Sequence, residues 1–145
     1  MIYGVQWDLV LKFIETKGAT TKEDLTSNSK EIGNCKDNLW NITNVNVKYS
    51  TNNGNTFNVC PYQKNASEGV LLTTGADTSF SLMNIYDLAG NVWEWTLGKT
   101  TSDSTPCALR GGHYGNYGDK HPASYCYNDS TGNNNYGVGF RISLF

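Results

Sequence analysis

The segment from His113 to Tyr136 constrains the fold most, because it holds no Leu, Ile or Val and cannot build a core of its own. Its aromatic residues argue against disorder. Rigid amphipathic rings interleaved with Asn, Gly and Ser are the chemistry that binding surfaces use for contact area and adaptable hydrogen bonds. The segment is therefore predicted to lie on a scaffold made by its flanks, either as a binding surface or as a polar loop with half-buried tyrosines.

The length of 145 residues fits one compact domain, and we expect residues 1–145 to form it. The net charge of -2 and the mixed placement of charged residues leave no basic stripe, so nucleic acid is not an expected partner. No apolar run is long enough for a membrane span, and the opening residues lack a signal-peptide pattern. Because the first Met can also mark a fragment, the sequence leaves the localisation open.

The cysteines Cys35, Cys60, Cys107 and Cys126 are widely spaced. They form no Cys-x-x-Cys pair that would indicate a zinc or thioredoxin-like site. Two disulfides and four free thiols both agree with this spacing.

Helical periodicity is clearest at the N-terminus. Trp7, Val10, Leu11 and Ile14 fall at i, i+3, i+4 and i+7, which predicts a core-facing helix over residues 5–16 that ends at Lys17 and Gly18. Thr20 and Glu23 have the spacing of a capping box and predict a short second helix through Leu25.

Strand patterns follow in two regions. Between residues 27 and 67, alternation at Val45, Val47 and Tyr49 predicts short strands among Asn-rich loops. Near the C-terminus, Trp93 and Trp95 alternate around Glu94, and Phe140, Ile142 and Leu144 alternate through the sequence GFRISL. Each of these two C-terminal segments is predicted to be a strand with one buried face.

Three further motifs carry a resemblance. The string NIYDLAGNVWEWT (residues 84–96), Arg110-Gly111-Gly112 and Gly139-Phe140-Arg141 together resemble the signature of the formylglycine-generating enzyme (sulfatase-modifying factor) family. The resemblance implies an α+β, C-type-lectin-like fold with small twisted antiparallel sheets, one or two helices and long loops. In such a fold we expect an antiparallel hairpin of the Trp93 and Phe140 segments, burying Trp93, Trp95, Phe140 and Ile142. It also implies a domain abbreviated at its N-terminus.

Enzymes of this family activate oxygen at two copper-binding cysteines beyond the Arg-Gly-Gly element. The matching positions here carry Asn116 and His121, which cannot supply the thiolates that Cu(I) requires. We therefore expect neither copper nor catalysis.

A non-catalytic branch of the same fold matches better: the variable proteins of diversity-generating retroelements, which are mutated at adenine-rich codons. Mutated Asn codons yield Tyr, His, Asp, Ser, Gly and Cys, the residue types found in segment 113–136. The resemblance makes this the candidate variable, ligand-binding segment. Its predicted ligand-facing residues are His113, Tyr114, Asn116, Tyr117, Asp119, His121, Tyr125, Tyr127, Asn128, Asp129, Asn133 and Asn134.

Four residues match a calcium site of the family: Asp87, Gly90, Val92 and Glu94. Two side-chain and two backbone oxygens would suit Ca²⁺. The alternative is that Glu94 is a partly buried carboxylate held by Arg110 or Arg141. Both arginines lie beside glycines and a predicted strand, which favours a structural role for them.

The expected function is display of a ligand-binding face on a virion or a cell surface, where the partner is a protein or glycan receptor. A homo-oligomer is expected by analogy. The alternatives are a glycan-binding lectin-like module, with or without calcium, a degenerate formylglycine-generating enzyme, and a structural surface domain with no specific ligand.

Overall fold

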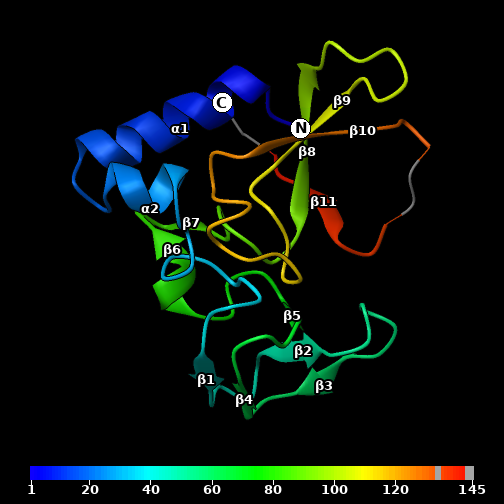
Figure 1. Cartoon of the computed structure of the whole chain (residues 1–145). Coiled ribbons are helices and arrows are strands. Elements are labelled where there is room, and N and C mark those ends of the chain that lie inside the picture. Colours follow the sequence, from blue (N-terminus) through cyan, green and yellow to red (C-terminus); the bar gives the residue numbers. More distant parts are fainter. Residues whose placement is uncertain (133–134, 143–145) are drawn as a thin grey trace.

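The computed structural model describes residues 1–132 and 135–142. The chain begins with two helices that pack against each other (Figure 1). Helix α1 (Gly4–Thr16) buries Trp7, Leu11 and Ile14 on one face. Lys17 caps the C-terminal end of the helix, and Gly18 follows with a φ of 69°, a conformation that glycine adopts without strain. The predicted first helix is confirmed.

The cap of helix α2 (Lys22–Thr26) lies one residue later than predicted. Thr21, and not Thr20, caps it: the Thr21 hydroxyl accepts from the Asp24 amide at 3.1 Å, and the Asp24 carboxylate accepts from the Thr21 amide at 3.0 Å. Thr20 also donates to the Asp24 carboxylate, at 2.8 Å. The predicted partner Glu23 was wrong because Asp24 stands three residues after Thr21 and closes the box.

Short strands form most of the remaining regular structure. The described residues contain β1 (Trp40–Ile42), β2 (Lys48–Ser50), β3 (Asn58–Val59), β4 (Tyr62–Lys64), β5 (Leu71–Leu72), β6 (Ser81–Leu82), β7 (Ile85–Tyr86), β8 (Trp93–Lys99), β9 (Cys107–Arg110), β10 (Cys126–Asp129) and β11 (Val138–Phe140), with the 3-10 helix η1 (Thr78–Phe80). They pair as β1-β4, β3-β2-β5, β6-β7 and β10-β9-β8-β11. Two helices with several small, mainly antiparallel sheets confirm the α+β, C-type-lectin-like prediction.

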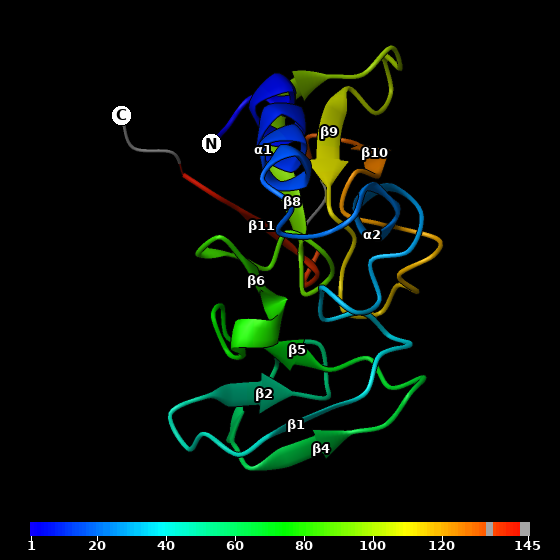
Figure 2. The same cartoon turned by 90° about the vertical axis from the view of Figure 1, so that its left-hand side faces the viewer.

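Two hydrophobic clusters divide the molecule. One cluster gathers α1, α2 and residues near β7 around Trp7 and Ile14, and the other lies under β1, β2, β4 and β5 around Trp40 and Phe80. Figures 1 and 2 both show the β1–β5 strands at one end of the molecule and α1 with the four-stranded sheet at the other.

Two buried asparagines join these halves. The Asn34 side chain donates to the Val70 carbonyl at 2.8 Å and to Asn91 Oδ1 at 3.2 Å, while the Asn91 amide group exchanges hydrogen bonds with the Leu72 backbone. A Cβ on Gly90 would lie 2.2 Å from the Asn34 carbonyl oxygen, so only glycine permits this approach. The buried amides therefore take part in a satisfied network that fixes the chain between the two clusters.

The predicted C-terminal hairpin is wrong. Strand β11 pairs with β8 in parallel, with Phe140 opposite Trp95, and β9 occupies the antiparallel position on the other edge of β8. Phe140 and Ile142 are 66% and 65% exposed. The reason is that Arg141 points inward to pair with buried Glu94, so its two neighbours in an extended segment must point outward.

All four cysteines carry free thiols, and Cys35 and Cys60 are buried. The structure therefore favours free thiols over disulfides. Of the helices in the described part of the chain, none is long and apolar enough to cross a membrane.

Candidate functional site

Trp93, at the start of β8, organises the predicted ligand-binding segment. Its ring contacts Tyr127 in a stacked arrangement at 5.6 Å, His121 edge-on at 5.4 Å, and Tyr125 and His113 at 6.0 and 6.3 Å between ring centroids. Trp93 itself is only 6% exposed. A buried ring of the sheet thus supports four rings of segment 113–136.

The strand β10 divides its side chains between the two faces of the sheet. Tyr127 stands opposite Leu109 and shares the side of Trp93 and Trp95. Cys126 and Asn128 alternate with it and point to the other side, where α1 packs. Of these three residues, only Tyr127 therefore lies on the same face of the sheet as Trp93.

The loop before β10 is held by a distant part of the chain. The Ser29 amide donates to the Gly118 carbonyl at 3.1 Å, and the Ser29 hydroxyl accepts from the Ala123 amide at 2.8 Å. The Asp37 carboxylate accepts from the Gly118 amide at 2.9 Å. Sequence reasoning assigned residues 27–67 only to loops and strands, and no local pattern in them marked this support.

The predicted ligand-facing residues that the structure describes are exposed, half-buried or buried. Tyr117, Asp119, Tyr127 and Asn128 are exposed, and His113, Asn116, His121 and Tyr125 are half-buried. Asn133 and Asn134 lie outside the described residues. Tyr136, which was not among the predicted ligand contacts, is 64% exposed. On the exposed side, the Lys36 ammonium lies 5.5 Å from the centre of the Tyr117 ring.

The remaining two predicted residues, Tyr114 and Asp129, are buried. The Tyr114 hydroxyl donates to Asn53 Oδ1 at 2.9 Å, and its ring lies 6% exposed beneath the loop. Asp129 is 8% exposed and accepts from the Ser130 amide at 2.7 Å. We correct the prediction for these two, because both side chains are buried and have partners inside the protein, and Tyr114 ties the loop to Asn53.

His113 is fitted closely into its turn. Its Nδ1 accepts from the Gly115 amide at 2.8 Å, and its ring packs edge-on against Tyr114. Burial, with a smaller contribution from His121, lowers the pKa of His113 to about 4. In the charged imidazolium, Nδ1 carries a proton and would face the Gly115 N–H, donor against donor. The turn therefore requires the neutral form of His113. Burial also lowers the pKa of His121, and the charge of Asp119 opposes this.

The predicted calcium residues lie around an arginine. Arg141 Nε donates to Glu94 Oε2 at 2.5 Å, and its Nη2 binds Glu94 Oε1 and the carbonyls of Tyr86 and Asp87. The Asp87 carboxylate accepts from the Gly75 amide at 3.1 Å. Burial raises the pKa of Asp87 and of Glu94, while Arg141 opposes both shifts. Of the two arginines considered for Glu94, the structure assigns Arg141, since Arg110 pairs with Asp8.

This arrangement does not fit a calcium ion while Arg141 is in place. Asp87, Val92 and Glu94 line one cavity of about 220 Å³, but Arg141 lines it as well and already neutralises Glu94. In the part of the chain that the structure describes, no three or more His, Cys, Asp or Glu side chains are placed to hold a metal. Calcium at Asp87, Gly90, Val92 and Glu94 stays a prediction.

Comparison with known proteins gives one match. The profile of the FGE-sulfatase family, described as a sulfatase-modifying factor enzyme 1-like domain, matches residues 16–144. No curated protein and no solved structure matches the chain. The matched range contains the whole ring assembly around Trp93 and the Glu94–Arg141 pair. The chain therefore belongs to the family of sulfatase-modifying factor enzyme 1-like domains.

Proposed function

We propose that this chain is a non-catalytic binding protein of the diversity-generating-retroelement type, displayed on a virion or cell surface. One observation carries the proposal: the exposed Tyr127 ring lies on buried Trp93, so the candidate ligand face is supported by rigid structure. Exposed Tyr117 and Asp119 lie in the loop that Ser29 and Asp37 hold. A receptor protein or a glycan is the expected ligand.

The division between support and surface favours this function. Exchange of Tyr117 or Asp119 removes no buried contact, whereas Tyr114 and Trp93 are needed to hold the loop. A face of this design can change its ligand while the fold persists. The palette of Tyr, His, Asn, Asp and Ser in segment 113–136 agrees with mutation of Asn codons.

The chain lacks the cysteine ligands that the family's copper-dependent catalysis requires. Asn116 accepts from the His113 amide through Oδ1 at 3.1 Å and serves the turn, and His121 packs against Trp93 and Tyr125. Neither side chain supplies the soft thiolate that Cu(I) requires. Cys126 points to the other side of the sheet from Tyr127. A degenerate relative of the enzyme is therefore compatible with the family and with a binding role.

Glycan binding is the second candidate, favoured by the same Tyr127 ring. One of its faces stacks on Trp93, and the side chain is 45% exposed, which leaves aromatic surface for a sugar ring. A glycan array probed with and without calcium tests this candidate. Binding that disappears in Tyr127→Ser supports it, whereas absence of binding to any glycan leaves a receptor protein as the ligand.

The test of the main proposal is to sequence the genomic neighbourhood of the coding region. We expect a reverse transcriptase gene and a near-copy of the segment encoding residues 113–145 that differs only opposite template adenines. Differences at positions 117, 119 and 127 would identify the variable residues directly. A neighbourhood with neither element would contradict the retroelement proposal and leave a fixed binding module or a degenerate enzyme.

A further inference from the structure

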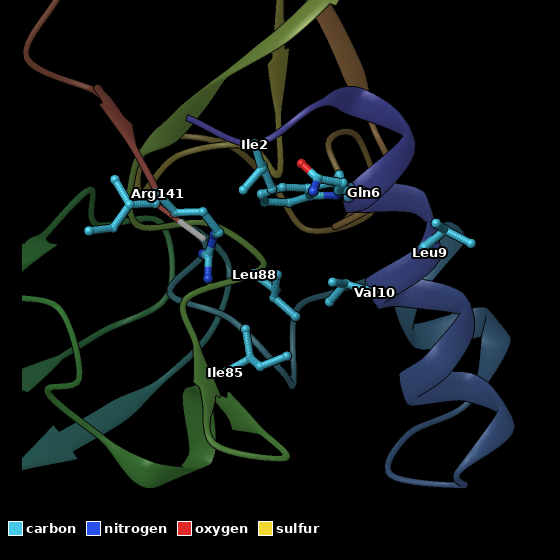
Figure 3. A pocket seen from close by; sticks show the side chains of 9 residues that line it. Ile2, Gln6, Leu9, Val10, Ile85, Leu88 and Arg141 are labelled. Atoms are coloured by element: carbon cyan, nitrogen blue, oxygen red, sulfur yellow. The ribbon is translucent and has the colours of Figure 1, made fainter. Parts of the chain in front are cut away.

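A cavity of about 430 Å³ lies between helix α1 and the chain around β7 (Figure 3). Most of the side chains in its wall are apolar, among them Val10 of α1, Ile85 of β7 and Leu88. Figure 3 shows Val10 pointing toward Leu88 across the cavity. A cavity of this volume with a largely apolar wall and few polar groups is of the kind that holds a small molecule.

The first polar group in the wall is the side-chain amide of Gln6. Its Oε1 accepts a hydrogen bond from the Tyr3 amide at 2.7 Å, as part of the cap of α1. Because a backbone N–H needs an acceptor, this bond fixes the oxygen toward Tyr3 and leaves Nε2 as the other end. No described residue accepts a hydrogen bond from Nε2, so Gln6 brings an unpaired donor to the cavity.

The second polar group is the guanidinium of Arg141, whose Cζ lies 5.4 Å from the centre of the Trp7 ring. Its Nε and Nη2 atoms are used in the pair with Glu94 and in bonds to two backbone carbonyls. Nη1 has no acceptor in the part of the chain that the structure describes. Arg141 and Gln6 both line the cavity, and Figure 3 shows them on either side of Ile2.

These two groups indicate the chemistry of an occupant. Both unpaired ends are N–H donors, whereas the indole N–H of Trp7 is already bound to the Ala123 carbonyl at 2.9 Å. A matching molecule therefore carries an acceptor oxygen at one end. A neutral oxygen fits better than a carboxylate, since Glu94 already balances the charge of Arg141 and the Asp87 carboxylate acts on it as well.

We propose that this cavity binds a small uncharged molecule with an apolar body and a carbonyl oxygen at one end, such as a fatty-acid amide or ester. The carbonyl oxygen accepts from Gln6 Nε2 or from Arg141 Nη1, and the apolar body lies between Val10 and Leu88. Burial of that body supplies most of the binding free energy, and the two donors select the end group.

The cavity is separate from the candidate ligand face. Arg110 reaches Asp8 on the α1 side of the sheet, and Glu94, the partner of Arg141, stands opposite Arg110 and so shares that side. Tyr127 points to the other side. A molecule in the cavity therefore leaves the candidate ligand face free, and its binding does not depend on the function proposed for segment 113–136.

Titration with three compounds that share one alkyl chain tests the proposal: hexanamide, hexanoate and hexylamine. The measurement is the NMR chemical shift of the Gln6 side-chain amide and of the Val10 methyl groups. Hexanamide should shift both to saturation, with a dissociation constant on the order of millimolar, as suits so small a molecule. Hexanoate should bind about tenfold more weakly because of its charge. Hexylamine, which lacks an acceptor, should shift neither signal.

Two variants locate the binding. Gln6→Glu can still accept from the Tyr3 amide but replaces the donor nitrogen by an oxygen, so it should weaken hexanamide binding by about tenfold. Gln63→Glu is the matched control, since it makes the same change at an exposed residue of β4. Val10→Phe places a ring in the cavity and should abolish binding. Circular dichroism of each variant confirms that it is folded.

Four results would each overturn the proposal. They are no shift with hexanamide, equal binding of the three compounds, equal loss of binding in Gln6→Glu and Gln63→Glu, and binding that appears only after deletion of residues 143–145. In the last case the end of the chain, and not a separate molecule, would be the occupant.

Discussion

Tyr127 lies nearly parallel to Trp93, with ring centroids 5.6 Å apart and an angle of 29° between the planes. The first ring is 45% exposed and the second 6% exposed, so one stack joins the surface to the core. This relationship explains how a segment without Leu, Ile or Val keeps a defined conformation. Its stability comes from the rings and backbone bonds that the rest of the chain supplies.

Replacement of Trp93 should therefore disturb the whole segment. We expect Trp93→Ala to lower the free energy of unfolding by about 3 to 5 kcal/mol, because a large buried ring and its four ring contacts are lost. Tyr136→Ala, at a side chain 64% exposed, should change it by no more than about 0.5 kcal/mol. Urea denaturation of both variants measures the difference, and equal losses would contradict the assignment of Trp93 as the support.

The second prediction concerns the stabilising hydrogen bonds of buried Lys64. Its side chain is fully buried, and its Nζ donates to the carbonyls of Cys35, Lys36 and Asn38 and to Asn38 Oδ1. Burial lowers the pKa of this ammonium, which the four oxygens stabilise in its charged form. Lys64→Met removes the charged donor from all four oxygens, although the amides of Asn38 and Ser67 still donate to the Cys35 and Lys36 carbonyls, and it should cost about 2 to 4 kcal/mol of stability.

The matched control for this experiment is Lys12→Met, whose side chain is 68% exposed. Thermal denaturation should show little change for it. A similar small effect of Lys64→Met would mean that the turn at Lys36 and Asn38 holds without the ammonium.

Variants of the Glu94–Arg141 pair test whether Glu94 has a structural role or binds calcium. Wild-type protein should show the same melting temperature with Ca²⁺ and with a chelator, because Arg141 holds both oxygens of Glu94. Arg141→Ala leaves a buried carboxylate unpaired and should lower the free energy of unfolding by about 3 to 5 kcal/mol at neutral pH. Ca²⁺ should restore part of this loss, since Asp87 and Glu94 line the same cavity. A clear rise of the wild-type melting temperature with Ca²⁺ would support the calcium prediction instead.

Acid should weaken the turn at His113. Its folded pKa of about 4 lies below the ordinary 6.5, so the unfolded chain binds a proton first as the pH falls from 6.5 to 4. The free energy of unfolding then decreases with falling pH, by on the order of 1 kcal/mol at pH 5 after allowance for the partly exposed ring.

His113→Asn isolates this contribution, because Asn Oδ1 can accept from the Gly115 amide as Nδ1 does and does not titrate. Its stability should vary less than that of the wild type between pH 7 and pH 5. Identical pH profiles of the two proteins would show that His113 is not the group responsible.

Helix α1 and the strand at Trp93 were predictable from sequence because each depends on local periodicity, with Trp7, Leu11 and Ile14 on one face. The outward position of Phe140 was not, because it follows from an ion pair between Arg141 and Glu94, 47 residues apart. An alternating apolar pattern predicts that the apolar side chains form the buried face. It cannot show that the charged residue between them points inward instead.

The same limit applies to the candidate site. The composition of segment 113–136 indicates a binding surface, but it cannot separate Tyr114 from Tyr117. The tertiary structure separates the two. The Tyr114 ring is buried and its hydroxyl donates to Asn53, whereas the Tyr117 ring is exposed. Asn34 gave no signal either, because one buried asparagine resembles the many exposed ones in an Asn-rich sequence.

The central claim, an exchangeable face on a fixed scaffold, is tested most directly by a triple variant with Tyr117→Ser, Asp119→Ser and Tyr127→Asn. The measurement is its free energy of unfolding beside that of wild type and Trp93→Ala. We predict a cooperative transition and a loss below about 2 kcal/mol, since the three side chains are exposed. A loss as large as that of Trp93→Ala would contradict the claim and show that these side chains maintain the fold.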